Sequence, residues 1–167
     1  MEIERVKNMK VALTHAGKFH ADDVFGAAFL KIINPDIEIV RSNIVPDDFE
    51  GLVFDIGMGR FDHHMADKSV RENDIPYAAF GLLWREFASS IYGNYVYESI
   101  DRKLIQDLDL ADNIGSYNAL AIAIDAFNPE DVKNSDSEFF EAMEFAKKIL
   151  IKMIDKQKRC EKDLVKV

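Results

Sequence analysis

The sequence predicts an α/β fold, in which a parallel β-sheet is flanked by helices and the C-terminal half of the chain is mainly helical. Short apolar runs alternate with one amphipathic helix over residues 9–54, and this strand–helix–strand order is typical of parallel strands. After residue 76, apolar side chains recur at helical spacing. The chain has 167 residues, 48 % of them apolar and 12 of them Phe, which suits one domain with a substantial core. We therefore expect a single domain over residues 1–167.

The first half of the chain contains the strands of this sheet. The expected elements, in chain order, are a strand over Met9–Thr14, a helix from Asp22 to about Ile33, a strand over Ile37–Val40 and a buried strand over Leu52–Phe54. His15 follows the first strand, and Asp55 follows the third. Because the carboxyl ends of parallel strands share one edge, we expect these side chains at the same edge, where open α/β sheets bind ligands.

The second half is expected to be helical. Polar residues 65–74 predict a surface loop, and Pro76 fits the first turn of a helix that ends at Gly93. Its aromatic side chains recur at helical spacing and are expected in the core. Further on we expect a helix over Glu98–Asn113, a small apolar segment over Tyr117–Phe127 and a last helix that opens with a capping box, Ser135-x-x-Glu138.

Two carboxylates near the end of the helix over Glu98–Asn113 are candidate ligands. Its apolar stripe is formed by Ile100, Leu104, Leu108 and Ala111. Asp112 lies on the flank of this stripe, whereas Asp109 points further away. A carboxylate that leans toward a core needs a partner, so Asp112 is the better candidate for a ligand and Asp109 is the alternative.

Composition excludes several classes of protein. The net charge of −9 argues against a broad phosphate-binding surface, although metal ions can hold a phosphate in an acidic pocket. No apolar run approaches the roughly 20 residues that span a membrane, and we expect no signal peptide in the polar start, Met1–Lys10. The single Cys160 cannot form an internal disulfide, which fits a cytoplasmic protein.

All four histidines lie in two short stretches that are also rich in aspartate. His15 and His20 precede Asp22 and Asp23, while Asp62-His63-His64 follows Asp55. An Asp at a helix start is ordinarily a cap and a His pair is often a solvated loop, but neither explains this concentration. The candidate metal ligands are His15, His20, Asp22, Asp55, His63 and Asp112.

Nitrogen and oxygen ligands without a thiolate suit Mn²⁺, Fe²⁺, Co²⁺ or Zn²⁺. Three carboxylates crowded together would repel one another without a cation. Two ions would relieve this repulsion, and Asp55 is the natural bridge between them. Two such ions would also activate water and stabilise the attacking and leaving oxygens at phosphorus.

Three motifs carry a resemblance to a known family. Thr14-His15-Ala16-Gly17-Lys18-Phe19-His20-Ala21-Asp22-Asp23, Phe54-Asp55-Ile56-Gly57 and Phe61-Asp62-His63-His64 resemble the DHH phosphoesterase superfamily. Within it, the first motif resembles the melanocyte-proliferating-gene family of metal-dependent hydrolases or RNA exonucleases. Asp109-Leu110-Ala111-Asp112-Asn113 and Phe127-Asn128-Pro129 resemble later stretches of that family. The likeness covers about residues 9–155.

The resemblance implies a site for two Mn²⁺ ions at the C-terminal edge of the sheet. By motif position, His15, His20 and Asp55 would hold one ion, and Asp22, Asp55, His63 and Asp112 the other. His64 would face the substrate phosphate, and Asp62 would orient a neighbouring imidazole. The family usually has Cys-Asp-Glu where this chain has Ala21-Asp22-Asp23. Relatives continue into a second domain that closes over the cleft, which we expect to be absent here.

The sequence thus predicts a Mn²⁺-dependent phosphoesterase that hydrolyses a phosphodiester, either a nucleotide or a short oligonucleotide. A homodimer or another partner would then cover the cleft. The alternative is a non-catalytic metal- or nucleotide-binding module that has lost its lid domain. A third hypothesis is another metal hydrolase, such as a pyrophosphatase-like enzyme.

Overall fold

A computed structural model describes residues 2–65 and 68–166. Its strands are β1 (Val11–Thr14), β2 (Glu38–Arg41) and β3 (Leu52–Val53). Its α-helices are α1 (Glu2–Asn8), α2 (Ala21–Ile33), α3 (Ala79–Tyr92), α4 (Asn94–Ile100), α5 (Gln106–Ile114), α6 (Ala119–Asp125) and α7 (Asp136–Val165). A π-helical turn, Asp101–Ile105, joins α4 to α5, and a 3₁₀ turn, Val132–Asn134, precedes α7.

The strands form a small parallel sheet in the order β2–β1–β3. The parallel pairing and the helical second half confirm the predicted fold class. β1 is the central strand, and its Ala12 and Leu13 are buried. Since all the strands run the same way, the loops that follow β1 and β3 leave the sheet at one edge.

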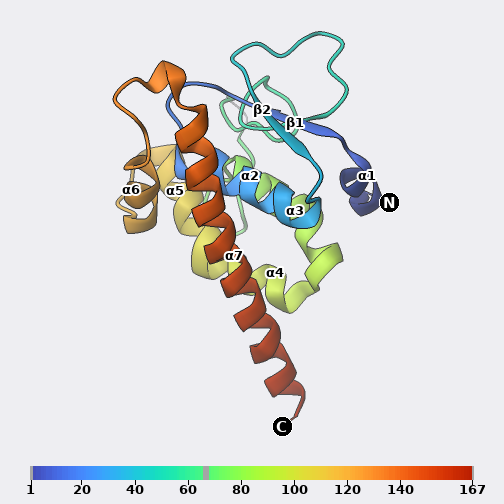
Figure 1. Ribbon diagram of the computed structural model, residues 1–167. Coiled ribbons are helices and arrows are strands. Elements are labelled where there is room, and N and C mark those ends of the chain that lie inside the picture. Colours follow the sequence, from blue (N-terminus) through green and yellow to red (C-terminus); the bar gives the residue numbers. More distant parts are fainter. Residues whose placement is uncertain (1, 66–67, 167) are drawn as a thin grey trace.

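Helix α2 is buried along nearly its whole length and lies next to the sheet, in contact with α3, α5, α6 and α7 (Figure 1). Ala21 through Leu30 are buried, so the helix is apolar around most of its circumference. It packs against α3 and α7, and a Cβ on Gly26 would lie 3.2 Å from the side chains of Leu83 and Phe54. This close packing fixes the first turn of α2 relative to the sheet edge.

The long helix α7 crosses the body of the protein and its last turns extend beyond it (Figure 1). Phe139, Met143, Ala146 and Leu150 are buried along its apolar stripe, as the spacing predicts. No helix in the described parts of the chain combines the length and apolar character that crossing a membrane requires.

One predicted helix start and one predicted helix cap differ from the structure because distant residues take part. Helix α3 begins at Ala79 rather than at Pro76, which instead forms a β-bridge with Val70. The carboxylate of Asp22 accepts hydrogen bonds from the N–H groups of Ala79 and Phe80, so a residue from another helix caps α3. Ser135 precedes α7, but its hydroxyl donates to the carbonyl of Gly17 instead of capping the helix.

The segment over residues 65–74 is only partly the surface loop that its polarity predicts. Ala66 and Asp67 lie outside the described residues, and most of the others are exposed. Arg71, however, is buried and donates to both Asp101 and Asp109. The next predicted helix also begins earlier than expected, at Asn94, and runs through the π-helical turn to Ile114.

Candidate metal centre

His15 and Asp55 meet at the sheet edge because of the strand register. Leu13 pairs with Val53 across β1 and β3, so the residues two positions further along are neighbours. The distance from His15 Nε2 to Asp55 Oδ2 is 3.2 Å. Asp55 has a φ of +59°, a left-handed conformation that costs a residue with a side chain roughly 1–2 kcal/mol. Strain of this kind gathers at functional sites.

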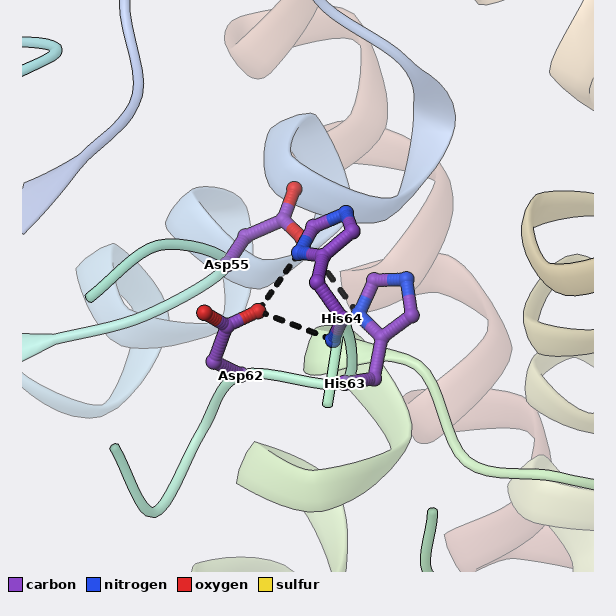
Figure 2. Close-up of side chains that lie close together, drawn as sticks. All are labelled: Asp55, Asp62, His63 and His64. Atoms are coloured by element: carbon purple, nitrogen blue, oxygen red, sulfur yellow. Dashed lines mark hydrogen bonds and ion pairs between the residues drawn. The ribbon is translucent and has the colours of Figure 1, made fainter. Parts of the chain in front are cut away.

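Figure 2 shows how Asp62 and His64 are held next to Asp55. The N–H of Asp55 donates to the carbonyl of Phe61, which brings the chain back to the sheet edge. Asp62 Oδ2 accepts from the N–H of Met58 at 2.7 Å, and Oδ1 lies 2.6 Å from His64 Nδ1. Burial alone would raise the pKa of Asp62, but the hydrogen bonds from Met58 and His64 outweigh it and lower the pKa.

His63 is buried, in contrast to His64, which is 59 % exposed. His63 Nε2 lies 2.6 Å from Asp112 Oδ2, and its Nδ1 lies 3.4 Å from Asp55 Oδ1. Burial lowers the pKa of this imidazole, yet the hydrogen bond to Asp112 and the charge of Asp55 raise it above its ordinary value. Asp55 therefore stands between His15 on one side and His63 on the other.

The first turn of α2 supplies two buried carboxylates. Asp22 Oδ2 lies 3.8 Å from His63 Nδ1, and the carboxylate also accepts the two N–H groups at the start of α3. Burial, followed by the charges of Asp55 and Asp112, raises the pKa of Asp22 well above its usual range. Asp23 Oδ2 lies 3.2 Å from His15 Nε2, and Oδ1 accepts from the N–H of His20 at 2.8 Å. The ring of His20 is exposed and lies near that of His15, with 6.5 Å between ring centroids.

Asp109 and Asp112 have different surroundings, and one part of the sequence prediction is wrong. Asp109 does not point away from the core: it is fully buried and lies 2.8 Å from Arg71 Nη2. Asp112 faces His63 in the cleft, as a ligand would. Burial raises the pKa of Asp109 to about 7, although the nearby Arg71 opposes this shift.

Side chains from distant parts of the sequence hold the backbone of the loop between His15 and His20. Asn128 accepts a hydrogen bond from the N–H of Phe19 at 3.1 Å and donates to its carbonyl at 2.8 Å. Arg41 donates to the carbonyl of Gly17 at 2.7 Å. The sequence motif draws attention to the Asn128-Pro129 pair. It gives no sign, however, that Asn128 holds the backbone of Phe19, more than 100 residues earlier in the chain.

A cation would fit this cluster, as its unpartnered polar atoms indicate. Asp23 Oδ2, Asp55 Oδ1 and His63 Nδ1 are buried, and none of the described residues offers them a hydrogen bond. Buried polar atoms of this kind are ordinarily paired with protein, water or an ion. The atoms gather in three groups that could each hold an ion: Asp55, Asp62, His63 and His64; His15, His20 and Asp23; Asp22, His63 and Asp112.

These groups face a cleft of about 1360 Å³. His15, His20, Asp55 and His64 are among the residues that line it, and so are Tyr117 and Ile122, from the region of α6. Tyr117 and Ile122 are exposed, so the cleft offers apolar as well as charged surface to a ligand.

Comparisons with known proteins identify the family of the chain. A family model, MYG1_exonuc, described as an uncharacterised protein family (UPF0160), matches residues 11–166. The chain is 25 % identical over 123 residues to the MYG1 protein of Dictyostelium discoideum, a match that covers 60 % of this chain and 37 % of that protein. The chain thus spans little more than a third of this curated relative's length. No solved structure matches it. Because the family model covers nearly the whole sequence, the chain belongs to the MYG1_exonuc family.

Proposed function

We propose that this chain is a DHH-type domain that hydrolyses a phosphodiester bond in a nucleotide or short oligonucleotide with the help of divalent cations. The observation that carries this proposal is the position of Asp55. Its two oxygens lie 3.2 Å from His15 Nε2 and 3.4 Å from His63 Nδ1, respectively. A carboxylate between two imidazoles, with further carboxylates behind each, suits a bridge between two cations.

Two sets of ligands share Asp55 in this proposal. His15, His20 and Asp55 hold one cation, and Asp22, Asp55, His63 and Asp112 hold the other. The mixture of imidazole and carboxylate suits Mn²⁺, and also Zn²⁺, Co²⁺ or Fe²⁺. Such cations would supply Lewis-acid chemistry, lowering the pKa of water and offsetting negative charge on phosphoryl oxygens. The exonuclease-type name of the family supports a phosphodiester as the substrate.

His64 and Asp62 act on the substrate side of the site. Asp62 Oδ1, 2.6 Å from Nδ1, fixes the orientation of the exposed His64 ring. In this orientation, His64 faces the scissile phosphate. The depressed pKa of Asp62 keeps it ionised for this purpose.

The open cleft and the acidic surface limit what binds well. A chain with net charge −9 repels long nucleic acids, and what affinity there is falls with salt. Activated diesters need few contacts remote from the reacting phosphorus, so an open cleft reduces their rate of hydrolysis least. We expect slow turnover and a high KM for them, and poorer cleavage of oligonucleotides unless a second copy or a partner covers the cleft. The single Cys160 favours a cytoplasmic setting.

The test compares an activated phosphodiester with a short oligonucleotide, using the full chain with Mn²⁺ and with a chelator. We expect Mn²⁺-dependent release of product from the activated diester, and its loss in His63→Ala. Cys160→Ser, which changes a residue remote from the cleft, serves as the control and should keep wild-type activity. Mn²⁺ binding without cleavage of either substrate would favour a binding module instead.

A further inference from the structure

We propose that Asp23 is a direct ligand of the cation held by His15 and Asp55, in addition to its part in starting helix α2. This inference rests on the proposed function, since it concerns one of the two cations at that site. Motif position assigns Asp22 as a ligand of the other cation and gives Asp23 no such role.

The first argument is that three atoms of the kind that bind metal ions converge. His15 Nδ1 lies 3.0 Å from the carbonyl of Ala16, and because a carbonyl only accepts, Nδ1 carries a proton. His15 Nε2 faces Asp23 Oδ2 and Asp55 Oδ2, each at 3.2 Å. Burial lowers the pKa of His15, but the hydrogen bond to Asp55 and the charge of Asp23 raise it to about 9, so in the metal-free protein a proton on Nε2 holds these atoms together. A cation that replaces this proton would find the same three atoms around it.

The spacing itself fits a shared cation. Nitrogen and oxygen ligands lie about 2.1 Å from a divalent ion, so neighbouring ligand atoms are roughly 3–3.5 Å apart. Both distances from His15 Nε2 fall in this interval. The ring of His20 is within reach of the same position and is exposed, so it is the ligand open to exchange with solvent.

The second argument is that the two oxygens of Asp23 have separate surroundings. Oδ1 accepts from the N–H of His20 at 2.8 Å, which accounts for the capping role. Oδ2 is buried in a side chain with 0 % exposure, and no described residue gives it a hydrogen bond. Its contact with His15 Nε2 at 3.2 Å is an ion pair only while His15 is protonated, and a cation would satisfy the buried oxygen without that proton.

The carboxylate of Asp22 differs from that of Asp23 in its hydrogen bonds. Both of its oxygens already accept backbone N–H groups, at 3.0 Å from Ala79 and 2.8 Å from Phe80. A carboxylate has about four lone-pair sites, so Asp22 can still bind the other cation, but part of its capacity is used to tie α2 to α3. Asp23 has the freer oxygen of the two.

The experiment titrates Mn²⁺ into the full chain and compares wild type, Asp23→Asn and Asp125→Asn. Asparagine keeps an Oδ1 acceptor for the His20 N–H, so the helix start is preserved, but it replaces the free oxygen with an NH₂ group. Asp125→Asn is the matched control, because it removes one negative charge from the same cleft without touching the cluster. Calorimetry and the electron paramagnetic resonance of free Mn²⁺ measure binding, and circular dichroism measures the melting of the metal-free protein.

We expect Asp23→Asn to bind one Mn²⁺ of two with wild-type affinity and the other roughly 100-fold more weakly, which is at or beyond the upper end of the usual outer-sphere effect. Its metal-free melting temperature should equal or exceed that of wild type, and Asp125→Asn should keep both ions. If Asp23→Asn binds both ions as wild type does, Asp23 only caps the helix and the inference is wrong, while the proposed function stands. If wild type itself binds no Mn²⁺, both fail.

Discussion

The structure separates Asp109 from Asp112, and replacing each by alanine should have opposite consequences. Asp109 is fully buried, pairs with Arg71 at 2.8 Å and accepts from the N–H of Gly81 at 3.3 Å. Removing one partner of a buried ion pair costs about 3–5 kcal/mol. Arg71 keeps its contact with Asp101 in Asp109→Ala, so we expect the lower end, about 3 kcal/mol.

For a chain of this length, each kcal/mol shifts the melting temperature by roughly 2–4 °C, so Asp109→Ala should melt roughly 6–12 °C lower. Asp112 is partly exposed and faces His63. Asp112→Ala should shift the metal-free melting temperature by no more than about 3 °C, since it also relieves repulsion with the carboxylates nearby. It should, however, weaken one Mn²⁺ site severely.

The assay is thermal unfolding by circular dichroism with a chelator present, followed by calorimetric titration of Mn²⁺ at a temperature where both variants are folded. Asp109→Ala should melt early but bind two ions. Asp112→Ala should melt near wild type and lose an ion. The reverse pattern, a stable Asp109→Ala without Mn²⁺ and an unstable Asp112→Ala with two ions, would refute the assignment of the two carboxylates.

Three further predictions concern the other residues of the site. Asp55→Asn should abolish phosphodiester hydrolysis and weaken both Mn²⁺ ions, because it removes the shared carboxylate; titration that shows only one weakened ion would contradict the bridge. Asp62→Asn should lower kcat only about 10–100-fold, the usual effect of a group that orients another, and a larger loss than that of Asp55→Asn would reverse their roles. Asn128→Ala leaves the N–H and carbonyl of Phe19 unpaired, so it should lower the free energy of unfolding by about 1–3 kcal/mol and weaken the binding of Mn²⁺ at His15. Mn²⁺ affinity equal to that of wild type would show that this loop does not support the site.

The sequence alone determined the fold class and the place of the candidate site. Apolar runs at Met9–Thr14 and Leu52–Phe54 predict parallel strands, which the structure has as Val11–Thr14 and Leu52–Val53, and His15 and Asp55 follow the two predicted runs directly. Parallel strands in register bring the residues that follow them to one edge, so local order in the chain is enough to place these two side chains together. The same logic holds for Asp62-His63-His64, which is only a short loop away from Asp55.

Only the tertiary structure decided how the individual carboxylates are used. A helical projection from Ile100 to Ala111 places Asp109 away from the core, but it assumes a regular helix. The π-helical turn over Asp101–Ile105 adds a residue to one turn, which changes the face on which later residues lie. Arg71, which comes from a polar segment and is buried, then pairs with Asp109, and no periodic pattern reveals such a partner.

At the start of α2, too, only the tertiary structure decides how each carboxylate is used. Asp22 and Asp23 are identical in type and adjacent in the chain, and motif position alone marked Asp22 as the ligand. Asp22 has both oxygens engaged by the N–H groups of α3, whereas Asp23 has one oxygen free beside His15. The number of lone pairs left for a cation depends on which distant N–H groups approach each carboxylate, and this is settled only when the helices pack together.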